Sequence, residues 1–165
     1  METIDYTKMI RKIGKQEALL ATGIALLIDT LILVIGFGKQ YDSESFYDPK
    51  LWATAVFAFA LLIVGQLFGQ TCAKFISKHS RAWWLGGIIC AFATLFVSAA
   101  ICGLYFLLAT GEIIKGNVSV WENIVSAVFA LPAVFVVYSS PVLVAHGLWF
   151  GYRISNKIKK LAAEL

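Results

Sequence analysis

Charged residues are scarce in this 165-residue chain: Asp, Glu, Lys and Arg make up 15% of it, against 59% hydrophobic residues. A soluble domain of this size needs more polar side chains than that to cover its surface. The mean hydropathy of +0.79 agrees with this shortage. The composition therefore excludes a water-soluble fold and predicts a protein that lies in a membrane.

Cysteine and histidine are also scarce, and the common catalytic motifs are missing. The three cysteines, Cys72, Cys90 and Cys102, contain no C-x-x-C pair. Their spacing argues against structural disulfides and against a membrane thiol oxidoreductase. Neither His79 nor His146 belongs to a set of cysteines or acids that completes a metal site. Hydrolase, metalloprotease, phosphate-loop and dinucleotide-binding motifs are missing. We expect no enzymatic activity, no metal and no cofactor.

Four long apolar runs fill most of the sequence, at residues 18–37, 51–69, 83–109 and 123–150. Each is close to or above the roughly 20 residues with which a helix crosses about 30 Å of hydrocarbon. The segments between the runs are too short to bury a core of their own. The sequence therefore predicts an all-α integral membrane protein, with residues 1–165 forming a single domain of four transmembrane helices in an up-down bundle.

Lys and Arg are unevenly distributed among the segments outside these runs. Of the 14, eleven stand before the first run, between the second and third, or after the fourth, and only Lys39, Lys50 and Lys115 stand in the other two loops. Cations near span ends are retained on the cytoplasmic side of a membrane. We therefore expect both termini to be cytoplasmic. The compact chain and its short loops favour a bacterial inner membrane.

Both ends of the chain are basic and amphipathic. Ile10 and Ile13 alternate with Lys and Arg before the first run, and Ile154, Ile158 and Leu161 do so after the last. Such stretches bind anionic membrane surfaces, at about 1 kcal/mol for each cation. We expect both ends to lie on the cytoplasmic membrane surface, with the lipid bilayer rather than a nucleic acid as their partner.

Two sequence signals mark helix starts. Asp48 and Pro49 fit a capping residue followed by proline at the first helical position. Ser119-x-x-Glu122 fits a capping box at the start of the fourth helix.

Asp29 is the only acidic residue inside the four apolar runs. A carboxylate near the bilayer midplane costs on the order of 2.5–3.5 kcal/mol, so it should be protonated, paired or directed at a polar cavity. A rise of about 1.5 Å per residue places it at the depth of Pro141. That proline leaves the carbonyl of Val137 without its helical donor. These considerations predict an intramembrane polar site that consists of Asp29, Ser139, Ser140, Pro141, His146, Gln66 and Thr94.

Two interpretations of this site remain open. Pro132 and Pro141 interrupt the fourth run, and broken helices near the midplane form substrate sites in several transporters. In the structural interpretation, a neutral Asp29 holds helices together and the two serines satisfy a proline kink.

Small residues one turn apart occur in three of the runs. The pairs are Gly65 with Gly69, Ala99 with Gly103, and Gly147 with Gly151. In lipid, such pairs mark faces where helix backbones approach closely, within one chain or between chains.

The layout resembles that of the immunity proteins against pore-forming colicins, which sit in the inner membrane and intercept a toxin's channel domain. This resemblance covers span number, length and termini only. The first-span carboxylate is similar to that of small multidrug transporters, which are shorter and carry glutamate there.

Two functions are therefore expected. The first is a non-enzymatic interaction, accessory or immunity/exclusion-type protein that binds another membrane protein or forms a homo-oligomer. The alternative is a small transporter or channel component that uses Asp29 for proton or cation coupling. The sequence favours the first, because it offers one carboxylate, no partner charge in the spans and no repeat symmetry.

Overall fold

The computed structural model describes residues 2–37, 49–110 and 119–164, and within these ranges it describes only the backbone of residues 2–5, 28–37, 49–51 and 131. The described chain is almost entirely helical. Its elements are α1 (Glu2–Phe37), α2 (Pro49–Lys78), the short 3-10 helix η2 (Ser80–Ala82), α3 (Trp83–Thr110), α4 (Val120–Val125), the π-helix η4 (Ser126–Ala130) and α5 (Leu131–Glu164).

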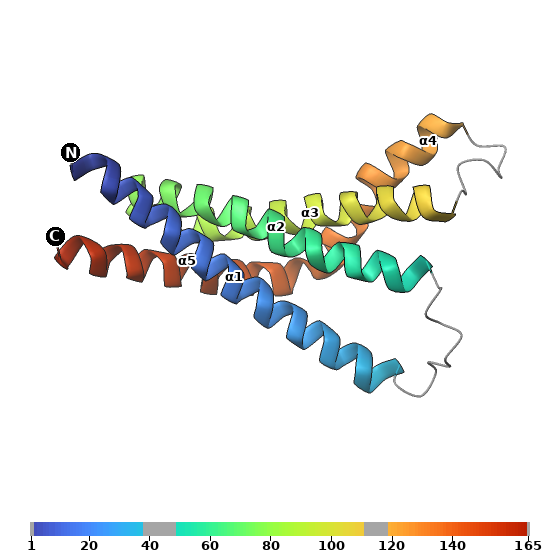
Figure 1. Cartoon of the computed structure of the whole chain (residues 1–165), viewed down its shortest axis with the longest axis horizontal. Helices are drawn as coiled ribbons and strands as arrows, with labels where there is room; N and C mark the ends of the chain where they lie inside the picture. Colours follow the sequence, from blue (N-terminus) through green and yellow to red (C-terminus); the bar gives the residue numbers. More distant parts are fainter. Residues whose placement is uncertain (1, 38–48, 111–118, 165) are drawn as a thin grey trace.

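The helices form an antiparallel bundle in which α1, α2, α3 and the α4–α5 segment run back and forth (Figure 1). Both termini lie at one end, which we call the terminal end; α4 lies at the other. Three segments are long and apolar enough to cross a membrane: Trp52–Lys78, Ser80–Thr110 and Val120–Glu164. The first predicted span, residues 18–37, lies within α1, but the side chains of its second half are outside the described residues.

The helices extend well beyond the apolar runs at the terminal end. α2 continues past residue 69 to Lys78, α5 continues past residue 150 to Glu164, and α1 already begins at Glu2. We expected both basic ends to lie on the membrane surface. For the apolar faces of these ends this expectation is wrong. Ile10, Ile154 and Ile158 are buried in the bundle core, because the ends of α1 and α5 pack against α2 and against each other.

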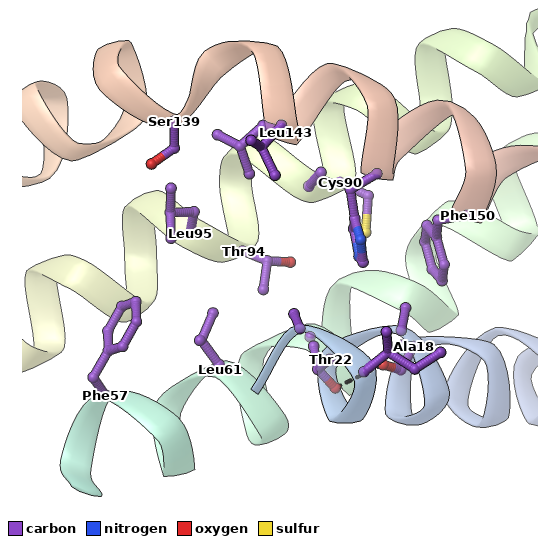
Figure 2. Close-up of a pocket in the computed structure, with 17 residues that line it drawn as sticks. Ala18, Thr22, Phe57, Leu61, Cys90, Thr94, Leu95, Ser139, Leu143 and Phe150 are labelled. Atoms are coloured by element: carbon purple, nitrogen blue, oxygen red, sulfur yellow. Dashed lines mark hydrogen bonds between the residues drawn. The ribbon is translucent and has the colours of Figure 1, made fainter. Parts of the chain in front are cut away.

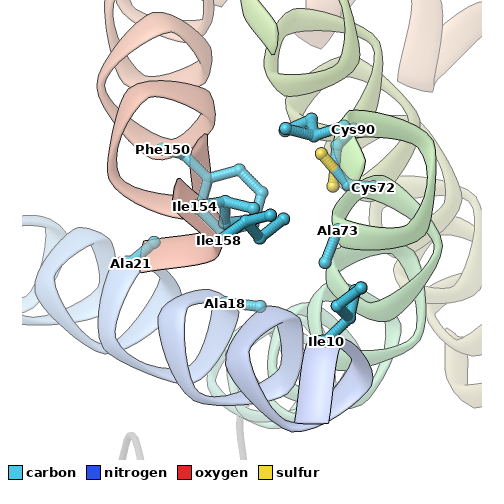
Figure 3. Packing of buried hydrophobic residues seen from close by; sticks show 10 residues of the cluster. Ile10, Ala18, Ala21, Cys72, Ala73, Cys90, Phe150, Ile154 and Ile158 are labelled. Atoms are coloured by element: carbon cyan, nitrogen blue, oxygen red, sulfur yellow. The ribbon is translucent and has the colours of Figure 1, made fainter. Parts of the chain in front are cut away.

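This core combines small and large side chains from all four long helices (Figure 3). Its members are Ile10, Ala18, Ala21, Cys72, Ala73, Ile76, Cys90, Phe150, Ile154 and Ile158. The opposite end is more open, since α1 diverges from the other helices toward Phe37 and α4 is inclined away from them (Figure 1).

Both predicted helix starts agree with the observed helices. α2 begins at Pro49, although Asp48 lies outside the described residues. The capping box before α4 is confirmed: the Ser119 hydroxyl accepts from the backbone N–H of Glu122, and the Glu122 carboxylate accepts from the backbone N–H of Ser119, each at 3.2 Å.

The fourth helical segment bends where the π-helix η4 joins α4 to α5 (Figure 1). Pro132, which is fully buried, follows two residues later and offers no N–H to the carbonyl of Val128. A π-helical turn absorbs such a break in the hydrogen-bond ladder. α5 continues as a helix through Pro141.

The closest helix contact joins α3 to α5 through glycines. A Cβ on Gly87 would lie 2.1 Å from the carbonyl oxygen of Gly147 and 2.9 Å from the backbone of Gly151. A Cβ on Gly151 would in turn lie 2.5 Å from the carbonyl oxygen of Trp83. The two backbones can approach this closely only because none of the three glycines carries a side chain.

Small residues also mediate the other helix contacts. A Cβ on Gly14 of α1 would lie 2.3 Å from the carbonyl oxygen of Gly69 on α2. A Cβ added at Gly65 would lie 2.8 Å from the Thr22 side chain, and one added at Gly103 would lie 2.5 Å from the carbonyl oxygen of Ala127. Ala99 is buried in α3. The small residues noted in the sequence therefore face helices of this chain.

We expect Gly87→Ala to destabilise the protein by about 1–3 kcal/mol, since the added methyl group must push α3 away from α5. Gly23→Ala is the matched control, because a Cβ at Gly23 meets nothing within 4 Å. Its stability should be unchanged or slightly higher. The measurement is the unfolding midpoint of each variant in lipid nanodiscs. Equal effects of the two substitutions would contradict the proposed close contact.

Candidate functional site

A cavity of about 260 Å³ lies between α1, α2, α3 and α5 (Figure 2). Its walls are mostly apolar and include Phe57 and Leu61 of α2 and Phe150 of α5. Apolar pockets with a few polar groups are the usual form of small-molecule sites between the helices of a bundle. The polar lining groups therefore decide what this cavity could bind.

Apart from Ile24, the α1 wall of the cavity is built from small side chains. Ala18, Ala21, Thr22 and Ala25 recur at helical spacing and line it. Because these side chains are short and α1 diverges beyond them, the space between α1 and its neighbours is not filled. The Thr22 hydroxyl donates to the carbonyl oxygen of Ala18 at 2.7 Å, so this polar group is already satisfied within α1.

The α3 wall carries a polar stripe in which residues follow one another at intervals of four. Its members are Cys90, Thr94, Ser98 and Cys102. Cys90 and Thr94 line the cavity. Ser98 is completely buried, and its hydroxyl has no hydrogen-bond partner in the part of the chain that the structure describes. The stripe thus brings neutral polar groups into the interior of the bundle.

The α5 wall contributes Ser139, Leu143 and His146 to the same cavity. Their spacing of four and three residues places them on one face of the helix. His146 also packs against Trp149, with ring centroids 5.8 Å apart. The described part of the cavity therefore offers hydroxyls, a thiol and an imidazole, but no carboxylate and no Lys or Arg.

The polar residues selected from the sequence separate into two groups. Thr94, Ser139 and His146 line the cavity together, and so does Gly65. Gln66, Ser140 and Pro141 are not among its lining residues; Pro141 is exposed on the outer surface of α5.

Asp29 belongs to α1, one turn after the cavity-lining Ala25. Its side chain is outside the described residues.

An ion-pair cluster that the sequence did not suggest joins α1 to α5 beside the cavity. Glu17 is 2% exposed, and its carboxylate accepts from Arg153 Nε at 2.5 Å and lies 2.6 Å from Lys157 Nζ. Arg153 and Lys157 are one turn apart on α5, so both cations reach the same carboxylate. Arg153 also lies over the Trp149 ring, 5.3 Å from its centroid.

The two cations keep Glu17 ionised. Burial raises the pKa of this carboxyl, but hydrogen bonds from Arg153 and Lys157 together lower it more, so the pKa lies below its usual 4.5. Glu17 immediately precedes Ala18, which lines the cavity. The ion pair therefore fixes α1 against α5 just where the cavity begins.

The described lining of the cavity supplies hydrogen-bonding groups and apolar contacts. No cluster of three or more His, Cys, Asp or Glu side chains that could hold a metal ion occurs among the described residues. The cavity's hydroxyls and imidazole can form hydrogen bonds with a neutral guest, and its apolar walls can contact the apolar part of that guest.

Comparison with known proteins gives no relative: no protein-family model matches the chain, and neither a curated protein nor a solved structure is significantly similar to it. The interpretation of the site therefore rests on its own residues.

We expect Glu17→Gln to reduce stability by about 1–2 kcal/mol at neutral pH, a modest loss because Arg153 and Lys157 are partly exposed to solvent. Since folding lowers the pKa of Glu17, its contribution is present above the unfolded-state pKa of about 4.5 and is lost as pH falls through the folded-state value.

Unfolding midpoints measured from pH 7 downward test this expectation. The difference between wild type and Glu17→Gln should shrink below about pH 4.5. Glu164→Gln, at an exposed position of the same end, is the control and should unfold like the wild type at each pH. A Glu17→Gln difference that persists unchanged in acid would refute the assigned role.

Proposed function

We propose that this is a non-enzymatic membrane protein that binds another membrane protein within the bilayer, in the manner of an accessory or immunity/exclusion-type protein. The observation that carries this proposal is the exposure of Tyr138, a polar side chain far from both ends of the bundle. Apolar exposure alone would not support it, because lipid tails satisfy apolar side chains as well as a protein does.

Tyr138 is 84% exposed on the outer face of α5. It lies 14 residues before Tyr152 and 17 after Trp121, aromatic residues of the kind that sit at membrane interfaces. At about 1.5 Å per residue, Tyr138 is roughly 21 Å from Tyr152 along α5. The path to Trp121 is about 25 Å along the chain, with a bend at η4, so both aromatic residues are beyond the reach of the phenol. Its hydroxyl has no hydrogen-bond partner among the described residues, and an unsatisfied polar group in hydrocarbon is unfavourable.

A neighbouring helix would supply the missing hydrogen-bond acceptor. Around Tyr138 the outer face of α5 presents Val134, Phe135, Val137 and Val142, each more than half exposed. These exposed residues occur over about two and a half turns of α5, between residues 134 and 142, a length over which one helix of a partner could pack. A serine, threonine or backbone carbonyl of that helix would accept from the phenol.

The proposed orientation follows from charge. The cations of the terminal end, which include Arg11, Lys12, Lys159 and Lys160, are exposed. Under the positive-inside rule this end and both termini face the cytoplasm, in keeping with an inner-membrane location. The α4 end would then face outward.

Native purification in lipid nanodiscs, followed by mass spectrometry, identifies the partner. We expect a stoichiometric second membrane protein whose association is about 3- to 20-fold weaker with Tyr138→Phe, because hydrogen bonds in membranes contribute about 0.6–1.7 kcal/mol. Tyr152→Phe is the matched control and should bind normally. A monomer without any partner would overturn the proposal, and a second copy of this chain would make it a homo-oligomer.

The cavity supports the alternative, a small transporter or channel component. Thr94, Ser139 and His146 line it together, and the helical segment that carries two of them contains a π-helix and two prolines. Interrupted helices beside an interior polar site are a feature of several transporter folds. In this alternative, Asp29 carries the proton or cation.

Asp29→Asn separates the two functions. A carrier in liposomes should show a pH-driven proton flux that this substitution abolishes, because the amide cannot release a proton at these pH values. A binding protein should show no such flux, and the isosteric amide should preserve partner association. Flux that persists in Asp29→Asn would exclude the carrier role.

A further inference from the structure

Cys72 and Cys90 lie opposite each other in the bundle core although 17 residues separate them in the sequence, so the missing C-x-x-C pattern does not keep these two thiols apart. Figure 3 shows their sulfur atoms directed toward one another between α2 and α3. Both residues are less than a tenth exposed. The turn around η2 makes α2 and α3 an antiparallel hairpin, which places the two thiols at the same level.

Both thiols also line a second cavity, a crevice of about 240 Å³ between α2 and α3. Its walls include Phe68 and Phe75, and its rim includes Ile89, which is 57% exposed on the outside of the bundle. Because both helices belong to segments long and apolar enough to cross a membrane, Trp52–Lys78 and Ser80–Thr110, we expect lipid at this outer surface. The crevice therefore gives lipid-soluble molecules a route to the two thiols that water-soluble reagents lack.

We propose that Cys72 and Cys90 are a redox-active thiol pair that a lipid-soluble quinone, bound in the crevice between α2 and α3, oxidises to a disulfide. In this step the two S–H bonds break and one S–S bond forms. The two electrons and two protons pass to the quinone, which leaves as the hydroquinone. Thus one quinone and two thiols give one hydroquinone and one disulfide.

The surroundings of the thiols favour this class of oxidant. The crevice is almost wholly apolar, so a charged or strongly hydrated oxidant would lose its hydration on entry. A quinone is neutral, and so are the hydroquinone and the disulfide, so no net charge remains in the core. An apolar cavity of about 150 Å³ holds a benzene ring, so this crevice of about 240 Å³ has room for a substituted ring.

Oxidation would link α2 and α3 covalently next to their close contact. Gly86, which also lines the crevice, packs against Phe75 and Ile76 of α2. Cys90 belongs in addition to the wall of the larger cavity between the four helices. Formation of the disulfide would therefore change the lining of both cavities. This change does not depend on whether the protein binds a partner.

The test uses the reduced, full-length protein in lipid nanodiscs and ubiquinone with a single isoprenoid unit as the probe. All ring positions of this quinone are substituted, so a thiol cannot simply add to the ring. We expect the protein to lose the mass of two hydrogens, one hydroquinone to form per chain, and peptide mapping to find a disulfide between Cys72 and Cys90. Ferricyanide, which does not enter the bilayer, should leave the thiols reduced.

Cys102→Ala is the matched control. Cys102 lies on the same helix as Cys90, but its thiol donates to the carbonyl oxygen of Ala53 at 3.2 Å and is outside the crevice. This variant should oxidise like the wild type, whereas Cys72→Ala and Cys90→Ala should form no intramolecular disulfide. Three alkylatable thiols in the quinone-treated wild type would overturn the proposal. So would a disulfide that includes Cys102, or oxidation by a lipid hydroperoxide but not by the quinone.

Discussion

Close backbone approach through glycine is the constraint on which this bundle depends. Within lipid there is no hydrophobic force to drive helices together, so they associate through van der Waals contact and hydrogen bonds. Gly87 meets Gly147 and Gly151 between α3 and α5, and Gly14 meets Gly69 between α1 and α2. These contacts hold the terminal end together, where the buried isoleucines of α1, α2 and α5 also gather.

The interior cavity is a consequence of where this tight packing ends. α1 is fixed to α5 by the ion pairs of Glu17 and then diverges, with short side chains at Ala21 and Ala25 facing the remaining space. The polar stripe of α3 faces the same interior. A closely packed terminal end and a more open opposite end thus occur in one bundle, and the polar cavity lies between them.

Much of the helical architecture was predictable because its signals are local. Run length predicted long apolar helices, and three candidate spans agree. The capping box at Ser119 and the start at Pro49 were visible because a cap needs residues only a few positions apart. The stripe from Cys90 through Thr94 to Ser98 could also have been found, since its spacing of four is helical. The ends of the helices were harder to predict. The amphipathic extensions around Ile10 and Ile154 have the same sequence pattern whether their apolar faces contact lipid headgroups or a protein core.

By itself, the sequence determined that the chain is helical and apolar, where α2 and α4 begin, and which small residues permit close packing, because each property depends on composition or on neighbours within a turn. Only the tertiary structure decided which residues meet. Glu17 and Arg153 are 136 positions apart, and Cys72 and Cys90 lie on different helices. Such pairs depend on the rotation and register of packed helices, which are set by all contacts together and by no local pattern. The same rotation directs Ser139 and His146 into the cavity and leaves Pro141 on the outer surface.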